Sequence, residues 1–89
     1  MDQVVSQRVH DTPPSAYVLV STLAGAEKIT LESIRQIEGI ERIEEVYGIF
    51  DIVVATTPGI SKDEIGRITK TLRKIETVKS TVTMLVTTK

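Results

Sequence analysis

Cysteine, tryptophan and asparagine are absent from this 89-residue sequence, and histidine occurs once, at position 10. Without cysteine the chain has no disulfide, no thiolate metal ligand and no thiol nucleophile, a composition typical of a cytoplasmic protein. One histidine is too few for a zinc cluster, and a Ser-His-Asp triad would need His10, which lies in a polar leader. The phosphate loop and the dinucleotide glycine fingerprint are missing as well. We therefore expect no metal, no cofactor and no enzymatic activity.

The charge is nearly balanced, with 11 basic and 12 acidic residues and a net charge of -1. Domains that bind nucleic acid or an anionic membrane directly carry a clear basic excess, so neither partner is expected. No apolar run approaches the roughly 18 residues needed to cross a bilayer. The N-terminal residues also lack the basic and apolar regions of a secretory signal.

Residues 1–15 are polar and end in Pro13-Pro14-Ser15, which predicts a flexible N-terminal arm. Residues 16–89 read as one folded domain. Short apolar, β-branched runs bounded by glycine, proline and polar residues predict strands at residues 16–21, 40–47, 50–56 and 77–87.

Two amphipathic helices are predicted between these strands. The first covers residues 26–38, where apolar residues recur at positions 31, 34 and 37, and Gly39 follows where a C-cap glycine belongs. The second begins at Ser61 with an S-x-x-E capping box. Its apolar stripe consists of Ile65, Ile68, Leu72 and Ile75.

The sequence also repeats itself. Residues 33–40 resemble residues 71–78 at an offset of 38, and residues 19–22 resemble residues 53–56 at an offset of 34. Two similar β-α-β halves predict an α+β, ferredoxin-like βαββαβ fold. Its four-stranded antiparallel sheet has the order 4-1-3-2, with right-handed crossovers and both helices on one face.

No further helix is predicted that would cover the second face of this sheet. A strand with one solvated face alternates apolar and polar residues, yet residues 18–20 and 52–55 are uninterrupted apolar runs. The last strand places Val82, Met84 and Val86 on one face and Leu85 on the other. Large apolar patches are uncommon on monomers, so we expect a homodimer formed through this open sheet face.

The two helical regions carry charges of opposite sign. Residues 27–45 contain six acidic and three basic residues, whereas residues 62–79 contain six basic and three acidic residues. Such faces either steer the packing of subunits or are ordinary solvated surfaces. The sequence leaves both interpretations open.

The segment VYGIFDIVV at residues 46–54 resembles the V-x-G-x-[YF]-D-[ILV] signature of one regulator family. This is the effector-binding (RAM) domain of the leucine-responsive/asparagine-responsive (Lrp/AsnC) family. Residues 72–86 resemble that family's closing I-R-x-I-x-G-V-x-x-[ST]-x-T-x-x-V pattern, and residues 16–20 resemble its opening strand. The match departs at Thr77, where the family has glycine, and at Glu38, where proline is frequent.

The resemblance implies a stand-alone domain, because the fifteen residues before the first strand are too few for that family's DNA-binding helix-turn-helix. Domains of this kind pair sheet to sheet, and their dimers associate into tetramers, octamers or rings. They bind small molecules, usually amino acids, where dimers meet. The implied function is a non-enzymatic, oligomeric metabolite sensor that modulates transcription, through mixed oligomers with full-length Lrp/AsnC regulators, without binding DNA itself.

The resemblance also implies a ligand site at the turn between the second and third strands. Gly48 permits positive φ and leaves backbone amides open to a carboxylate, and Asp51 offers a negative charge to an ammonium group. Threonine hydroxyls and the adaptable side chain of Met84 would complete the site. The predicted ligand-binding residues are Gly48, Ile49, Phe50, Asp51, Thr81, Thr83 and Met84. Structural roles compete at each position: a hairpin glycine, a carboxylate that accepts from turn amides and a core methionine.

A small dimeric ferredoxin-like enzyme of the monooxygenase type is the alternative. Such an enzyme lines a sheet cavity with polar, histidine or aromatic residues, whereas this sheet is predicted to be aliphatic. An acylphosphatase would need an asparagine, which is absent. An RNA-recognition module would need exposed aromatic residues on its middle strands, and only 3% of the residues are aromatic.

Overall fold

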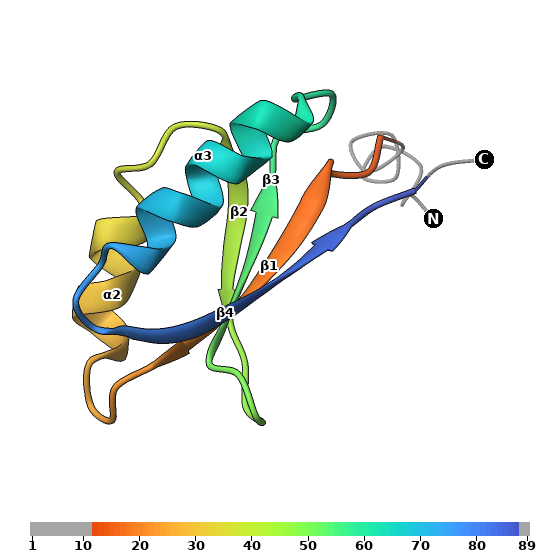
Figure 1. Ribbon diagram of the computed structural model, residues 1–89. Coiled ribbons are helices and arrows are strands. Elements are labelled where there is room, and N and C mark those ends of the chain that lie inside the picture. Colours follow the sequence, from red (N-terminus) through yellow and green to blue (C-terminus); the bar gives the residue numbers. More distant parts are fainter. Residues whose placement is uncertain (1–11, 88–89) are drawn as a thin grey trace.

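The computed structural model describes residues 12–87, so most of the predicted arm 1–15 lies outside the described residues. The described elements follow the order βαββαβ (Figure 1): β1 Ala16–Thr22, α2 Glu27–Ile34, β2 Ile40–Glu45, β3 Ile52–Thr56, α3 Lys62–Arg73 and β4 Val78–Leu85. The strands form one antiparallel sheet in the order β2-β3-β1-β4. The predicted α+β, ferredoxin-like arrangement and its strand order are thereby confirmed.

The central strand β1 sets the two faces of the sheet. Val18 lies opposite Val54 of β3 and Thr83 of β4, and the next residue, Leu19, lies opposite Val53 and Val82. Because successive side chains of a strand point to opposite sides, the Val18 row and the Leu19 row occupy different faces. We call them the helix face and the open face.

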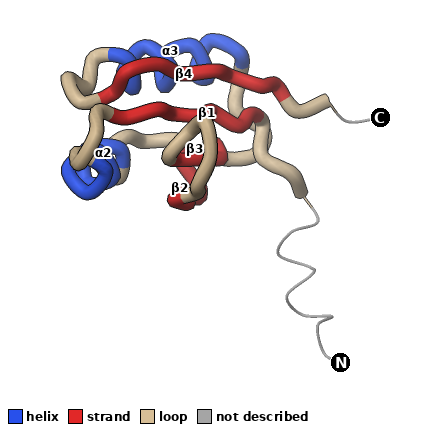
Figure 2. The backbone as a smooth tube through the Cα atoms, turned by 90° about the horizontal axis from the view of Figure 1, so that it is seen from below, coloured by secondary structure: helices blue, strands red, loops and turns tan. Residues whose placement is uncertain are grey.

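Both helices pack on the helix face (Figure 1), and α3 runs alongside the edge strand β4 (Figure 2). Side chains from β1, β3 and both helices meet there and exclude water completely. The buried cluster consists of Val18, Val20, Ile34, Ile52, Val54, Ile68 and Leu72. Burial of an aliphatic side chain of this size is worth about 1.5–3 kcal/mol, so this cluster is the main source of the domain's stability.

The start of α3 agrees with its sequence signal. Ser61 is the N-cap residue, and its hydroxyl accepts a hydrogen bond from the backbone N–H of Glu64 at 3.1 Å. This bond satisfies one of the amide groups that have no partner in the first turn of a helix. The predicted cap is thus confirmed.

The predicted end of α2 was wrong by four residues. The helix ends at Ile34, because the next amides turn to nearer carbonyls: Gln36 donates to Ser33 and Ile37 donates to Ile34, at 3.2 and 3.0 Å. Such i to i−3 bonds tighten the chain into a 3₁₀-like turn. Gly39 therefore lies in the turn before β2, with a φ of 94°, and is not the C-cap of α2.

The β2–β3 hairpin has a longer loop than the sequence pattern predicts. The strands end at Glu45 and resume at Ile52, while the amide of Val46 donates to the carbonyl of Asp51 at 2.9 Å. The sequence pattern extends the two strands to Tyr47 and back to Phe50 because those residues have strand propensity. Tyr47 and Phe50 instead lie in the loop, outside the paired residues of β2 and β3.

The described end of the arm is joined to the folded domain. Pro14 is buried, and Ser15 accepts hydrogen bonds at its carbonyl from Val86 N–H (3.0 Å) and at its hydroxyl from Ile60 N–H (3.1 Å). Within residues 12–87, neither helix is long and apolar enough to span a membrane. The same residues contain no group of three or more acidic or imidazole side chains placed to hold a metal ion.

Candidate functional site

The tip of the β2–β3 hairpin projects apolar side chains into solvent. Tyr47 and Ile49 are 105% and 88% exposed, although both have large hydrophobic side chains. Gly48 between them has a φ of 143°, and a Cβ placed there would meet no atom within 4 Å. Glycine is therefore needed at this position for its backbone conformation, and not to admit a neighbouring group.

Asp51 anchors this hairpin to the end of β1. Its Oδ2 accepts hydrogen bonds from the backbone N–H of Thr22 at 2.8 Å and from the Thr22 hydroxyl at 3.4 Å, and its own N–H donates to the carbonyl of Val20 at 2.9 Å. The carboxylate thus bonds a backbone amide of the neighbouring strand, and not one of its own turn. Oδ1 has no hydrogen-bond partner among residues 12–87.

A cavity of about 530 Å³ opens beside Asp51. Its walls come from the first turn of α2, the end of β2 and the hairpin, and they are formed by Glu27, Lys28, Glu45, Val46, Tyr47 and Asp51. Three carboxylates and one ammonium group therefore surround a space with an apolar side. This volume lies in the range of small-molecule sites, about 300–1,000 Å³. Such a mixture of charges suits a small zwitterion with an apolar part.

Of the residues that form these walls, Asp51 is the one that the sequence pattern predicted. Val46 and Tyr47 directly precede Gly48 in the segment that carries the family resemblance, so the sequence contained a signal that could have added them to the predicted site. Glu27 and Lys28 lie more than twenty positions before Asp51 in the chain. No local pattern marks them, because only the docking of α2 on the sheet brings them to the hairpin.

The three predicted site residues of β4 lie outside the hairpin. The Thr83 hydroxyl lies 3.2 Å from the hydroxyl of Thr69, and the Thr81 hydroxyl accepts from Nε of Arg73 at 3.4 Å, so both threonines face α3. Met84 points to the open face, opposite Tyr17. Within one chain the structure therefore places the two threonines on the same face and Met84 on the other, and it gives none of the three a hydrogen bond to the Gly48–Asp51 turn.

The open face is uncovered and apolar on three of its four strands. Its apolar side chains on β1, β3 and β4 are Tyr17, Leu19, Val53, Ala55, Val82 and Met84, and the pair Ser21 and Ser80 follows at one end. Val82 and Met84 are 45% and 46% exposed. The edge strand β2 differs, because it places Arg42 and Glu44 on this face, joined by an ion pair of 3.4 Å between Nε and Oε2. The open face is thus an apolar surface with a charged border.

Comparisons with known proteins agree with this architecture. No protein-family model matches the sequence, and no curated protein matches it. Among solved structures, FFRP-DM1 is similar over 81% of this chain and 96% of its own, with 29% identity and a TM-score of 0.71. The hypothetical protein PHS023 from Pyrococcus horikoshii has 28% identity and a TM-score of 0.69, over 83% and 89% of the two chains.

TTHA0845 from Thermus thermophilus shares the fold, with a TM-score of 0.72 at 20% identity over 83% of this chain and 92% of its own. FFRP-DM1 is an Lrp-family structure, and the likeness to it covers nearly all of the FFRP-DM1 chain. The βαββαβ sheet, the hairpin and the open face of this protein together form an Lrp-like fold.

Proposed function

We propose that this chain is a non-enzymatic regulatory domain of the Lrp type, which binds an amino acid or a close relative and acts as a homo-oligomer. The observation that carries the proposal is the likeness to FFRP-DM1, an Lrp-family structure, over nearly all of that chain. The fold by itself would not assign a function. The charges and the exposed surfaces of this chain therefore have to support the same conclusion.

The hairpin cavity supports a zwitterionic ligand. Lys28 supplies a cation for a carboxylate, and the carboxylates of Glu27, Glu45 and Asp51 supply acceptors for an ammonium group. Val46 and Tyr47 offer apolar contact for a side chain. A doubly anionic ligand would face three carboxylates, so its binding would be opposed by like charge.

The open face supports self-association. An apolar surface on β1, β3 and β4, bordered by the Arg42–Glu44 ion pair, has the apolar centre and polar rim of a protein interface. Two copies related by a two-fold axis would cover each other's apolar side chains. The same surface on a full-length regulator of this fold would accept this chain, which makes mixed oligomers a route to transcriptional control.

A monooxygenase-type enzyme is less well supported. Such chemistry needs polar or histidine side chains in the sheet cavity, and residues 12–87 contain no histidine. The open face instead carries aliphatic side chains around Tyr17. We therefore retain an enzyme only as an outcome of the experiment below.

The proposal is tested by calorimetric titration with the natural amino acids, together with native mass measurement of the same samples. We expect saturable binding of at least one amino acid, and a mass at least twice the 9.8 kDa of the chain. Lys28→Gln should weaken that ligand roughly tenfold or more, because it removes a charge-assisted hydrogen bond. Lys79→Gln is the matched control, because Lys79 is exposed on β4 and lies outside the cavity.

Binding that is equally weakened in both lysine variants would place the ligand outside the hairpin cavity. A monomer that binds none of the amino acids would refute the proposed function. Consumption of an added amino acid or of oxygen would favour the enzyme.

A further inference from the structure

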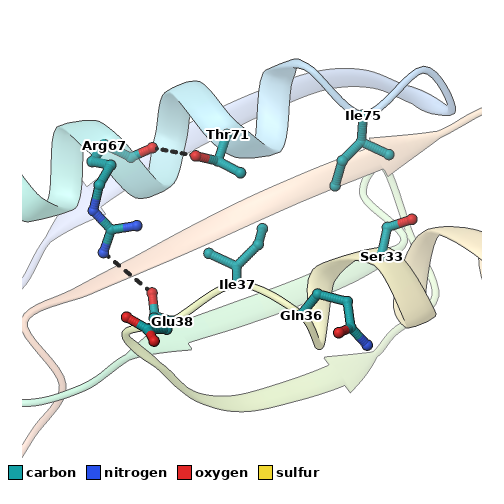
Figure 3. A pocket seen from close by; sticks show the side chains of 7 residues that line it. All are labelled: Ser33, Gln36, Ile37, Glu38, Arg67, Thr71 and Ile75. Carbon is teal, nitrogen blue, oxygen red and sulfur yellow. Dashed lines mark hydrogen bonds between the residues drawn. The ribbon is translucent and has the colours of Figure 1, made fainter.

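A second cavity, of about 480 Å³, lies between the two helices and shares no residue with the hairpin cavity. It opens between the end of α2 and the middle of α3 (Figure 3). Its walls are formed by Ser33, Gln36, Ile37, Glu38, Arg67, Thr71 and Ile75. The proposed function uses none of these residues.

The internal repeat of the sequence explains the shape of this cavity. At the offset of 38, Ser33 corresponds to Thr71, and Ile37 corresponds to Ile75. The two halves of the fold therefore contribute matching walls, each with one hydroxyl and one isoleucine. Figure 3 shows Ile37 and Ile75 entering the space between the helices from opposite sides. Both isoleucines are half-buried, so an apolar surface remains open to a ligand.

Arg67 breaks this symmetry and supplies the cavity's cation. At the offset of 38 its counterpart is Ile29, which carries no charge. The guanidinium reaches across from α3 and donates from Nη2 to the carbonyl of Glu38 at 3.3 Å (Figure 3). The guanidinium lies close to the next residue as well, since a Cβ at Gly39 would be in van der Waals contact with Nη2 at 3.6 Å. The position of the cation thus depends on the turn that precedes β2, which holds the carbonyl of Glu38 in place.

The guanidinium has capacity for an anion. Arginine carries five N–H donors, and Arg67 uses one of them in this contact. Its guanidinium has no carboxylate partner within 4 Å among residues 12–87. The ion pair that these residues do form joins Arg42 to Glu44 and does not involve Arg67. The side chains of Ser33 and Gln36 likewise make no hydrogen bond to the described residues, and Thr71 donates to the carbonyl of Arg67, which leaves its oxygen free to accept.

We propose that this interhelical cavity binds a small aliphatic monocarboxylate, with the carboxylate on Arg67 and the aliphatic chain between Ile37 and Ile75. One cation beside the Glu38 side chain suits a single negative charge and disfavours a polyanion. A planar guanidinium matches a carboxylate through two parallel hydrogen bonds. The ligand differs from that of the hairpin cavity, because it needs no ammonium group.

The experiment uses sodium isovalerate as the probe and amide chemical shifts of the full chain as the readout. We expect saturable shifts confined to the end of α2 and to α3. Affinity should rise from acetate to propionate to isovalerate, by roughly threefold to fourfold for each buried methylene. Isoamyl alcohol, which has no charge, should bind roughly tenfold more weakly or worse.

Two arginine variants separate this site from general attraction of anions. Arg67→Gln should weaken isovalerate roughly tenfold to a hundredfold. Arg35→Gln is the matched control, because Arg35 is exposed at the C-cap of α2 but does not line the cavity. Melting curves of both variants establish that each is folded.

Equal losses in the two variants, or phosphate binding as tight as that of isovalerate, would overturn the proposal. So would shifts that do not saturate, or that centre on the hairpin. Failure of this site would leave the amino-acid proposal intact, because the hairpin cavity is tested with different ligands and with Lys28.

Discussion

At the scale of single residues, Asp51 combines two demands that the sequence presented as alternatives. Its Oδ2 joins the hairpin to Thr22, while its side chain also lines the hairpin cavity. A carboxylate that bonds a backbone amide is held in one orientation, which positions Oδ1 for a ligand. The structural bond is observed, and the contact with a ligand is the prediction.

Replacing Asp51 by Ala should lower the free energy of unfolding by about 1.5–3 kcal/mol, because a partly buried hydrogen bond to a charged group is lost. Urea unfolding measures this change, with Glu32→Ala on the exposed surface of α2 as the control. If Asp51 also binds the ligand's ammonium, amino-acid affinity falls roughly tenfold to a hundredfold in the same variant. Lowered stability with unchanged affinity would assign Asp51 to structure alone.

Gly39→Ala should destabilise the protein more than Gly25→Ala. Both positions have positive φ, 94° and 81°, and an L-residue there costs about 1–2 kcal/mol. A Cβ at Gly39 would also lie 2.9 Å from Cδ1 of the buried Ile68, whereas Gly25 has no atom within 4 Å. Overpacking of this kind costs about 1–3 kcal/mol more. Equal losses in urea unfolding would mean that Ile68 moves aside freely.

At the scale of elements, the two repeated helices differ in how they begin. Ser61 caps α3 with its hydroxyl, but Ala26 precedes α2 and makes no side-chain cap. The capped helix has 12 residues and the uncapped one has 8. A free amide at a helix start costs stability. The cap therefore stabilises α3, the longer helix, relative to α2.

Ser61→Ala should therefore cost about 1 kcal/mol of stability, the usual value of a lost N-cap. Ser61→Asp should retain stability, because its carboxylate can accept from Glu64 N–H and interacts well with the helix dipole. Thermal unfolding of both variants checks this. A loss in the Asp variant as large as in the Ala variant would contradict a capping role.

At the scale of the whole molecule, the open face and the near-neutral charge each predict how the chain behaves toward partners.

Val82→Lys places a charge on the open face and should weaken self-association by about 2 kcal/mol or more. This loss corresponds to a roughly thirtyfold higher dissociation constant. Sedimentation over a range of concentrations measures this. Ile29→Lys is the matched control, because Ile29 is 63% exposed but lies on α2, away from the open face. Association that survives Val82→Lys would place the interface elsewhere.

We expect no sequence-specific DNA binding by this chain alone. Its 11 basic and 12 acidic residues provide no excess of cations for phosphate contacts. A gel-shift assay at physiological salt checks this, with an unrelated duplex as the control. Sequence-dependent binding below micromolar concentration would contradict the expectation.

The sequence by itself determined the order of the elements, the cap of α3 and the existence of two apolar sheet faces. These features depend on periodicity and on hydrogen bonds between residues a few positions apart, so local patterns carry them. Even the strand order followed, because the repeated halves leave few ways to connect the strands. The sequence did not determine the end of α2, because the apolar spacing continues to Ile37. The backbone nevertheless leaves the helix where Gln36 and Ile37 donate to carbonyls three residues earlier.

Only the tertiary structure decided which side chains share a site. Strand register turned Thr81 and Thr83 toward α3 and Met84 toward the open face, although the three lie within four positions of one another. The docking of the helices brought Lys28 to the hairpin and Arg67 to the turn after α2. Contacts between residues far apart in the chain depend on the packing of whole elements, and no short stretch of sequence contains that information.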